Sequence, residues 1–393
     1  MNSHIFNTEV QQFIGQHLDD DLTRLILKGS PFQDVTIREL AEQIESKRKC
    51  RSKLPTWFNS DGIYYPNKLN IEQTSSERTA EFKASLISGN SLLDLTGGLG
   101  VDSYYFSKRV RSCDYCEIQP ELFSIAQHNF NALNVTNIKC SASDGIKFLK
   151  QGCDVYDWIY IDPSRRSKKN DKVFLLKDCS PDLESNLDLI LDRAQRVMVK
   201  LSPFLDISLA LNQLNSVEEV YVVALDNEVK ELLFILRKNT AKKPIIRAVN
   251  LKKDKVELIS TDDDQTDTET AYGPVKNYLY EPNAAILKAG LFNLIGIKFK
   301  LYKLHPNSHL YSSDKLVEFP GRRFLVVEQF NYQPKKIKRL LGFDKANITT
   351  RNFKESVHQI RKRTGIKEGG DEFLFFTTDF AGQSKVIHCR KTI

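Results

Sequence analysis

The stretch LLDLTGGLGVD, residues 92–102, decides the fold of this 393-residue chain. A short apolar strand ends in an acid, a glycine-rich turn follows, and a helix then begins near Asp102. Glycines permit the tight turn and leave bare backbone against which a ligand can lie. The free amides at the start of the helix suit a negatively charged group. The stretch therefore predicts a nucleotide-like ligand at one edge of a parallel sheet.

Around this turn, short apolar runs alternate with helical stretches, which predicts a parallel sheet with helices on both faces. The expected strands are 92–95, 113–118, 137–140, 158–161, 196–199, 220–224 and 232–236. The link between the last two strands is too short for a crossover helix, so these two strands must run antiparallel. We therefore predict an α/β, Rossmann-like sheet of seven strands with an antiparallel last strand.

Polar residues follow successive strands at the edge where open α/β sheets bind ligands. Glu117 ends the second strand, 17 residues beyond Gly100, and a carboxylate there can accept both ribose hydroxyls of a nucleoside. Asp144 follows the third strand, where a short acid can accept a hydrogen bond from an adenine amino group. The fourth and fifth strands are followed by Asp162-Pro163-Ser164-Arg165-Arg166 and by Lys200-Leu201-Ser202. Lys200 and Ser202 are candidates for an acceptor pocket, and a structural role for their turn is the alternative.

Residues 91–236 resemble a class I S-adenosylmethionine (SAM)-dependent methyltransferase domain, whose sheet also ends in an antiparallel strand. Asp94 to Gly100 match its first motif, with Thr96 in place of the first glycine, as is typical of nucleic-acid methyltransferases. The resemblance implies SAM as cofactor, and the residues expected to bind it are Asp94, Thr96, Gly98, Gly100, Asp102, Glu117, Ile118, Asp144 and Gly145.

The segment after the fourth strand resembles the (Asp/Asn)-Pro-Pro-aromatic motif of enzymes that methylate exocyclic amines. The resemblance implies that Asp162, Pro163 and Arg165 form the catalytic segment, with Asp162 accepting hydrogen bonds from the target nitrogen. Ser164 replaces the second proline, and Arg165 stands where the aromatic residue would be. An arginine can stack on a base or clamp a phosphate, and the alternative is that Arg165 and Arg166 are an ordinary exposed pair.

The whole chain also resembles bacterial methyltransferases with a C-terminal THUMP-like domain, in residues 72–84, 162–166, 281–286 and 367–374. Such domains bind RNA in tRNA-modifying enzymes, so the resemblance implies an RNA partner and a helix near Ser75 that covers the SAM pocket. The expected regions are a helical N-terminal region, the methyltransferase domain, an α+β ferredoxin-like connecting region and a basic THUMP-like domain, at 1–90, 91–238, 239–322 and 323–393.

The charge distribution supports a polyanionic partner. Residues 331–393 contain 14 of the 57 Lys and Arg residues but 6 of the 50 Asp and Glu residues, so the rest of the chain is close to neutral. Basic runs at 334–339 and 361–363 lie near Phe343 and Phe353 in the sequence. Several such cations neutralise phosphates with little dependence on sequence. The alternative is a basic surface that only aids solubility.

Other classes of protein are disfavoured. No stretch approaches the roughly 20 apolar residues of a membrane span, and the N-terminus lacks the pattern of a signal peptide, so we expect a cytoplasmic protein with no membrane partner. Cys113 and Cys116 stand three apart in a predicted strand and point to opposite faces, so we expect no metal site.

The sequence thus predicts a SAM-dependent methyltransferase acting on a base of tRNA or rRNA. One alternative is a methyltransferase for a protein or a small molecule, in which the basic C-terminal region is incidental. The other is a non-catalytic RNA-binding protein that retains the SAM-type core.

Overall fold

The computed structural model describes residues 1–165, 176, 179–240, 243–262, 270–333, 337 and 342–392. The chain divides into two compact units. The first unit comprises Met1–Val220 with Glu231–Pro244, and the second comprises Tyr221–Lys230 with Ile245–Ile393. Among the described residues, no helix is both long enough and apolar enough to cross a membrane.

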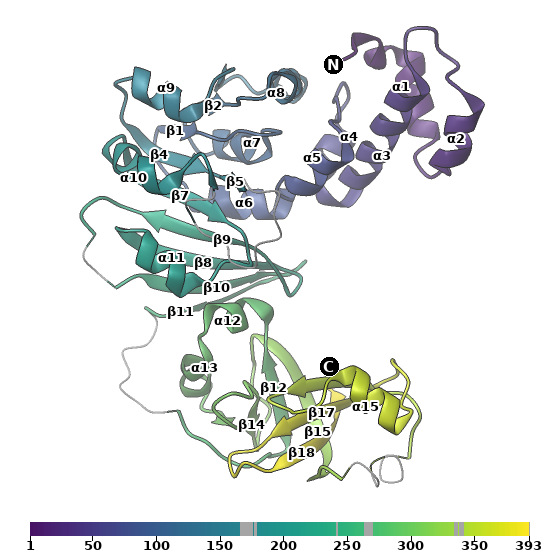
Figure 1. Cartoon of the computed structure of the whole chain (residues 1–393), viewed down its shortest axis with the longest axis vertical. Helices are drawn as coiled ribbons and strands as arrows, with labels where there is room; N and C mark the ends of the chain where they lie inside the picture. The colour runs from purple at the N-terminus through teal and green to yellow at the C-terminus, as the bar shows by residue number, and fades with distance from the viewer. Residues whose placement is uncertain are drawn as a thin grey trace. The chain divides into compact units, whose positions relative to one another are not determined.

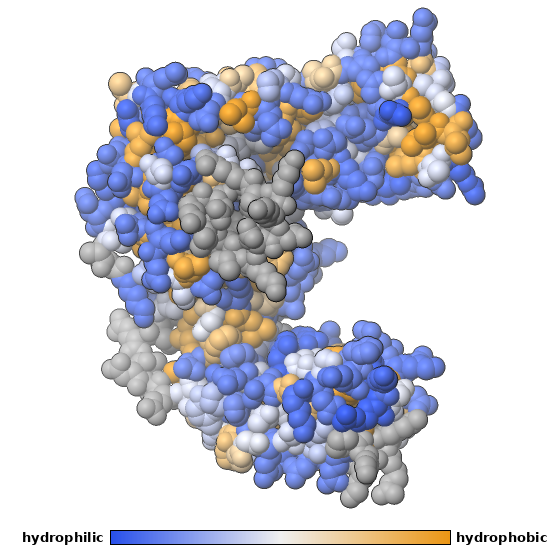
Figure 2. Space-filling view, in the orientation of Figure 1, coloured by the Kyte–Doolittle hydropathy of each residue, from blue (hydrophilic) through white to orange (hydrophobic). Residues whose placement is uncertain are grey.

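The first unit begins with helices that gather to one side of its sheet (Figure 1). They are η1 (Ser3–Phe6), α1 (Thr8–Gln16), α2 (Leu22–Lys28), α3 (Ile37–Lys53), α4 (Pro55–Asn59), α5 (Lys68–Gln73) and α6 (Glu77–Ser85). The α3 helix starts at a capping box, in which the Thr36 hydroxyl accepts from the Glu39 amide and the Glu39 carboxylate accepts from the Thr36 amide. Apolar side chains gather on the surface over α1 and α2 in Figure 2, and Ile26 and Leu27 of α2 are exposed.

The sheet around the glycine-rich turn has the predicted strands in a doubly wound order. They are β1 (Ser91–Asp94), β2 (Ser112–Cys116), β3 (Ile138–Ser141), β4 (Tyr156–Ile161), β7 (Ala194–Leu201), β8 (Val217–Leu225) and β9 (Glu228–Leu236). Their order is β3-β2-β1-β4-β7-β9-β8. Strand β1 runs parallel to β2 and β4, whereas β9 runs antiparallel to β7. The prediction of a Rossmann-like sheet with an antiparallel last strand is therefore confirmed.

The sheet contains nine strands rather than the predicted seven. The hairpin of β10 (Ile245–Leu251) and β11 (Val256–Ser260) continues the order beyond β8. Helices connect the parallel strands, as a parallel sheet requires. They are α7 (Val101–Ser107), α8 (Pro120–Ala132), α9 (Gly145–Gln151), α10 (Leu183–Asp192) and α11 (Ile207–Gln213). Two short strands, β5 (Ser164–Arg165) and β6 (Cys179–Ser180), pair after β4.

The second unit contains a seven-stranded sheet with short helices. Its elements are β12 (Tyr278–Pro282), α12 (Ala284–Ala289), α13 (Phe292–Lys298), β13 (Tyr302–Lys303), β14 (Tyr311–Ser313), β15 (Gly321–Asn331), β16 (Asn347–Arg351), α15 (Val357–Thr364), β17 (Glu372–Thr378) and β18 (Ser384–Lys391). The strand order is β13-β14-β12-β15-β18-β17-β16. Phe375 belongs to one buried apolar cluster, and its neighbours Leu374 and Phe376 belong to another. Because successive side chains of a strand point to opposite faces, this sheet is buried on both sides.

Candidate active site

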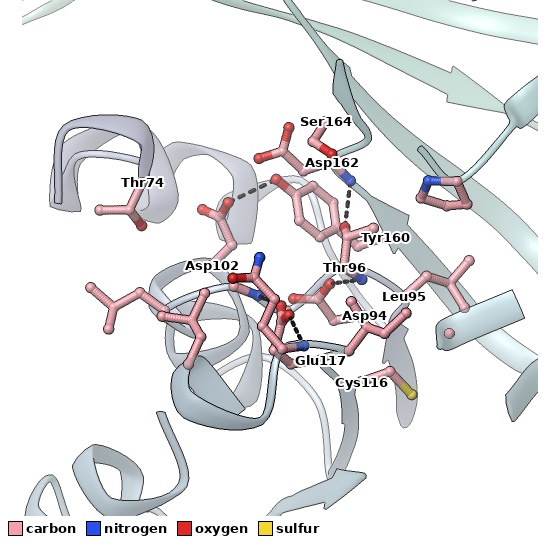
Figure 3. A pocket seen from close by; sticks show the side chains of 18 of the residues that line it. Thr74, Asp94, Leu95, Thr96, Asp102, Cys116, Glu117, Tyr160, Asp162 and Ser164 are labelled. Carbon is pink, nitrogen blue, oxygen red and sulfur yellow. Dashed lines mark hydrogen bonds between the residues drawn. The ribbon is translucent and has the colours of Figure 1, made fainter. Parts of the chain in front are cut away.

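A cavity of about 440 Å³ lies at the carboxyl ends of the central strands, within the first unit. Small-molecule sites have volumes of roughly 300–1,000 Å³. The lining comes from the glycine-rich turn after β1, the end of β2, the start of α9, the ends of β4 and β7, and residues 70–75 at the end of α5 and just after it. Figure 3 shows several of these side chains converging from separate elements. The edge that the sequence predicted as ligand-binding is therefore hollow.

The glycines of the turn are required for packing as much as for ligand approach. A Cβ atom on Gly97 would lie 2.0 Å from the Tyr115 ring, and one on Gly100 would lie 2.4 Å from the Phe130 ring. Gly98 has a φ of +55°, which disfavours other residues, and it lines the cavity. Gly100 is not among the lining residues, so its contribution is the close packing of the turn on α8.

The Glu117 carboxylate is oriented by backbone amides at the end of β2. One oxygen accepts from the Gly98 amide at 2.8 Å, a bond drawn in Figure 3, and the other accepts from the Gln119 amide at 2.7 Å. The side chain is buried apart from its part of the cavity wall. A carboxylate has about four lone-pair sites, so this geometry leaves acceptor capacity for the two hydroxyls of a ribose.

Asp94 and Asp144 each bond to backbone close to their own position in the chain. Asp94 accepts from the Thr96 amide at 3.0 Å and from the Ser103 hydroxyl. Burial raises the pKa of Asp94 to about 7, although the hydrogen bonds from Ser103 and Thr96 lower it. Asp144 caps α9 by accepting from the Lys147 amide at 2.9 Å, and it lines the cavity. Through its bonds to Thr96 and Ser103, Asp94 stabilises the conformation of the glycine-rich turn.

Thr96 connects the turn to the segment after β4. Its hydroxyl oxygen accepts from the Asp162 amide at 2.7 Å (Figure 3). A glycine at this position could not make that bond. The departure from the usual glycine motif therefore has a structural reason, since Thr96 fixes the backbone of Asp162 relative to the turn.

The Asp162 carboxylate lies beside the ammonium group of Lys200, which comes from β7. The distance from Lys200 Nζ to Asp162 Oδ2 is 2.5 Å, and both residues line the cavity. The Lys200 side chain is 13% exposed and the Asp162 side chain 36%, so the pair faces the cavity. Burial lowers the pKa of Lys200, but Asp162, Asp102 and Glu231 together raise it above its ordinary value. Lys200 therefore keeps its positive charge.

A buried network of charges lies behind this pair. Lys83 of α6 is fully buried, and its ammonium donates to both carboxylate oxygens of Glu231 at 2.8 Å and to the Ser75 hydroxyl at 3.0 Å. It also lies 3.3 Å from Asp102. Asp102 accepts from the hydroxyls of Ser75 and Tyr160 at 2.9 and 2.7 Å. The network joins α6 to α7, β4 and β9.

The carboxyls of this network respond to both lysines. Burial alone would raise the pKa of Asp102, but Lys83 and Lys200 hold it below its ordinary value. For Glu231, burial outweighs the same two lysines and raises the pKa. The same two lysines therefore offset burial fully for Asp102 but only in part for Glu231.

Most residues predicted from the sequence meet at the cavity. Eight of the nine expected cofactor residues line it, the exception being Gly100. Of the predicted catalytic segment, Asp162 lines the cavity and Pro163 is buried beside it. The backbone of Arg165 pairs with Cys179 in the β5–β6 ribbon, whereas its side chain and the whole of Arg166 lie outside the described residues. Lys200 lines the cavity, but Ser202 accepts a hydrogen bond from the Phe204 amide in the turn after β7.

Sequence reasoning missed several residues of the site. Asn70, Gln73 and Thr74 line the cavity from the N-terminal region, beside the Ser75 that the resemblance had implicated. Tyr160, Lys83 and Glu231 complete the charge network. Lys83 lies in residues 72–84, one of the segments that resemble bacterial methyltransferases with a THUMP-like domain, so a role near the site could have been predicted for it. No pattern in the sequence pointed to Glu231.

The comparisons with known proteins agree with this geometry. A ferredoxin-like domain family matches residues 278–320, and a THUMP domain-like family matches residues 321–391. An uncharacterized SAM-dependent methyltransferase of Mycobacterium tuberculosis is 25% identical over 273 residues, which are 69% of this chain and 72% of that protein. An uncharacterized RNA methyltransferase of Mycoplasma mobile is 28% identical over 168 residues, which are 41% of this chain and 45% of that protein.

A solved structure covers almost the whole chain. The crystal structure of a "putative methyltransferase" from Porphyromonas gingivalis W83 is 30% identical in sequence, with a TM-score of 0.86 over 98% of both chains. That structure therefore shares the fold of this chain along almost its whole length. Together with the glycine-rich turn and the antiparallel last strand, this similarity shows that the chain belongs to the SAM-dependent methyltransferases.

Proposed function

We propose that this methyltransferase transfers the methyl group of SAM to a nitrogen of an RNA base, and that Asp162 orients the acceptor. The observation that carries the proposal is the position of Asp162. Its amide is fixed by Thr96 and its carboxylate faces the cavity beside Lys200. A hydrogen-bond acceptor at that point can hold a target N–H while the nitrogen lone pair is directed into the cavity.

The residues of the cavity fit SAM. The Glu117 carboxylate suits the ribose hydroxyls, and Asp144 suits the adenine amino group. Ile118 lines the cavity with a side chain that is largely exposed, so it offers an apolar surface to the adenine ring. Gly98 leaves the backbone of the turn accessible. These residues would hold the cofactor through positions on β2, the glycine-rich turn and α9.

The reaction requires the protein mainly to align the acceptor nitrogen with the methyl group of SAM. When bound, SAM would supply a methyl group on a positively charged sulfur: the acceptor nitrogen bonds to the methyl carbon, the carbon–sulfur electron pair returns to sulfur, and the proton of the acceptor N–H leaves the methylated nitrogen for the Asp162 carboxylate or water. Asp162 holds the acceptor N–H, and the buried residues Tyr160 and Asp102 line the cavity beside it. Holding two reactants in a productive geometry contributes much of the catalysis in such reactions.

Three features support RNA as the acceptor. Residues 321–391 match a family that is described as THUMP domain-like. The relative from Mycoplasma mobile is called an RNA methyltransferase. The surface over α15 and its neighbouring strands is largely hydrophilic in Figure 2, and α15 ends in Arg361, Lys362 and Arg363.

Some cations of the basic region bond within the fold, and the others could contact phosphates. Arg361 donates to the carbonyls of Ile366 and Ala346, and Arg363 pairs with Glu355, so both also stabilise the fold. Phe343 and Phe353 pack against the apolar cluster of β17 and β18 rather than standing free on the surface. The basic run 334–339 lies outside the described residues apart from Ile337. Phosphate contacts by the remaining cations would give salt-dependent binding.

The proposal is tested by methyl transfer in vitro. Purified protein would be incubated with methyl-labelled SAM and total RNA from cells that lack the gene, and the RNA would be digested to nucleosides for mass spectrometry. We expect a single labelled nucleoside with the methyl group on nitrogen. Label in protein or small molecules and none in RNA would contradict the RNA acceptor and favour the alternative substrates.

A further inference from the structure

The pairing of Lys200 with Asp162 has a consequence for substrate choice. The Lys200 ammonium is 2.5 Å from Asp162 Oδ2, and both groups line the cavity wall. The two side chains come from different strands, β7 and the end of β4, and β4 and β7 are direct neighbours in the sheet. A hydrogen-bond acceptor and a hydrogen-bond donor are therefore presented side by side at one point of the cavity.

The backbone on either side of the pair is held firmly. Thr96 fixes the Asp162 amide, and the residues of β7 that flank Lys200 are fully or almost fully buried, Val199 at 0% and Leu201 at 3% exposed. Strand β7 pairs with β4 on one side and with β9 on the other, where Lys200 is opposite Leu233. The backbone of Lys200 is thus held on both edges, and the ion pair with Asp162 holds the ammonium at the cavity wall.

The acidic groups around Lys200 keep its ammonium group protonated, and the bond to Asp162 directs it to the cavity wall. The charged groups that act on Lys200 are Asp162 after β4, Asp102 on α7 and Glu231 on β9. Tyr160 on β4 donates a hydrogen bond to Asp102. Lys83 on α6 forms an ion pair with Glu231 and also contacts Asp102. An ammonium group has three N–H donors, and the bond to Asp162 uses one of them. Donor capacity therefore remains at the cavity wall.

A donor next to an acceptor matches the edge of a nucleobase. Adenine and cytosine each present an amine beside a ring nitrogen acceptor, and guanine presents N–H donors next to a carbonyl oxygen. A carboxylate accepts from the amine, and an ammonium donates to the neighbouring acceptor atom. A ring carbon carries no such donor, and a ribose hydroxyl lacks the planar N–H edge of a base, although it can itself donate and accept.

We propose that Lys200 is a positioning and specificity-determining residue for methyl transfer, which holds the Asp162 carboxylate in place and donates a hydrogen bond to the acceptor atom beside the target nitrogen of the base. This inference rests on the proposed RNA-base acceptor. It adds to Asp162 a second group that reads the base edge. The pair would select an N–H nitrogen with an adjacent acceptor.

The test compares Lys200→Met, Lys200→Arg and a matched control, Lys238→Met. Lys238 is an exposed lysine paired with Asp192 on the surface of the same unit, so its loss controls for the removal of one cation. The assay is methyl transfer from labelled SAM to total RNA of cells that lack the gene. Its readouts are the rate at saturating RNA, the apparent KM for RNA, the dissociation constant for SAM by calorimetry and the labelled nucleoside.

For Lys200→Met we expect the saturated rate to fall about 100-fold, because misplacing a reacting group by about 1 Å has an effect of that order. The dissociation constant for SAM should stay within about threefold of wild type, because Lys200 acts on the acceptor. Lys200→Arg keeps a cationic donor and should restore at least about a tenth of the rate. Lys238→Met should match wild type.

Several outcomes would overturn the proposal. A Lys200→Met rate within threefold of wild type would remove any role for Lys200, and a parallel loss of SAM affinity would place it in the cofactor site. Methylation of a ribose oxygen or a base carbon by the wild-type protein would contradict the reading of the base edge. If Lys200→Met does not fold, Lys200→Gln, which keeps N–H donors without the charge, is measured instead under the same criteria. A wild-type protein that binds SAM but labels no RNA would contradict the proposed acceptor itself.

Discussion

The two halves of the cavity edge are built in different ways. In the half that we propose binds the cofactor (the cofactor half), formed by the glycine-rich turn, Glu117 and Asp144, the carboxylates accept hydrogen bonds from backbone amides within the same or the neighbouring loop. In the half that we propose binds the acceptor (the acceptor half), formed by Asp162, Lys200 and the network of Lys83, Asp102 and Glu231, side-chain charges from distant segments contact one another. The cofactor half is thus specified by a contiguous motif, whereas the acceptor half depends on the tertiary fold.

The comparison predicts that the acceptor half is the more fragile in stability. Lys83→Met would leave Glu231 and Asp102 buried without their cation, so the free energy of unfolding should fall by about 3–5 kcal/mol. Urea unfolding followed by circular dichroism measures the change. The matched control is Lys230→Met, because Lys230 pairs with Glu228 at the surface and its loss should change stability by less than about 1 kcal/mol. Equal effects of the two substitutions would contradict a buried network.

The cofactor half should instead respond to pH near neutrality. The pKa of Asp94 is about 7 in the folded protein, compared with 3.8 for an aspartate in the unfolded chain. Between these two pH values the folded protein therefore keeps a proton that the unfolded chain has lost. Stability from this group is full below pH 4 and is lost as pH rises to about 7, with an upper limit of about 4 kcal/mol. Asp94→Asn does not titrate, so wild type should lose stability relative to this variant across that window. A difference that is constant between pH 4 and pH 8 would contradict the raised pKa.

Glu117 tests whether the cofactor half binds SAM. Glu117→Ala removes the carboxylate held by the Gly98 and Gln119 amides, and SAM affinity should fall about 10- to 100-fold, the loss expected for charge-assisted hydrogen bonds. Isothermal titration calorimetry gives the dissociation constant. Glu121 on α8 is exposed and does not line the cavity, so Glu121→Ala should bind SAM as wild type does. Comparable affinity in both variants would remove Glu117 from the site.

Thr96 joins the two halves, and its replacement should have the smallest effect. Thr96→Gly restores the common glycine but loses the bond to the Asp162 amide, which is worth about 1 kcal/mol, so the transfer rate should fall about fivefold. Thr96→Ser keeps the hydroxyl and should retain most of the rate. The rates at saturating SAM and RNA provide the comparison, and a Thr96→Gly variant as active as Thr96→Ser would show that the bond is unimportant.

The sequence predicted where the cofactor half lies for a physical reason. Glycine-rich turns and strand-end acids act through backbone geometry that neighbouring residues determine, so the spacing of Asp94 to Gly100, Glu117 and Asp144 predicted that they meet at one edge of the sheet. Their roles toward SAM stay a prediction. The antiparallel last strand followed from the short link between 224 and 232.

The acceptor half was less accessible from sequence. The partners of the Lys83 ammonium are 148 positions away at Glu231 and 8 away at Ser75, and no local pattern links such positions. Lys200 was a candidate by its strand, but its pairing with Asp162 depends on β4 and β7 being neighbours in the sheet. The extra strands β10 and β11 fall in the region that was expected to connect the two domains, because their place beside β8 is a tertiary property.

The central claim is that Asp162 serves the acceptor and not the cofactor, and the SAM dissociation constant of Asp162→Ala, measured by calorimetry beside its methyl transfer rate to RNA, tests it most directly. We predict SAM affinity within about threefold of wild type, together with a transfer rate about 100-fold lower. A tenfold or greater loss of SAM affinity, or a transfer rate equal to that of wild type, would contradict the account.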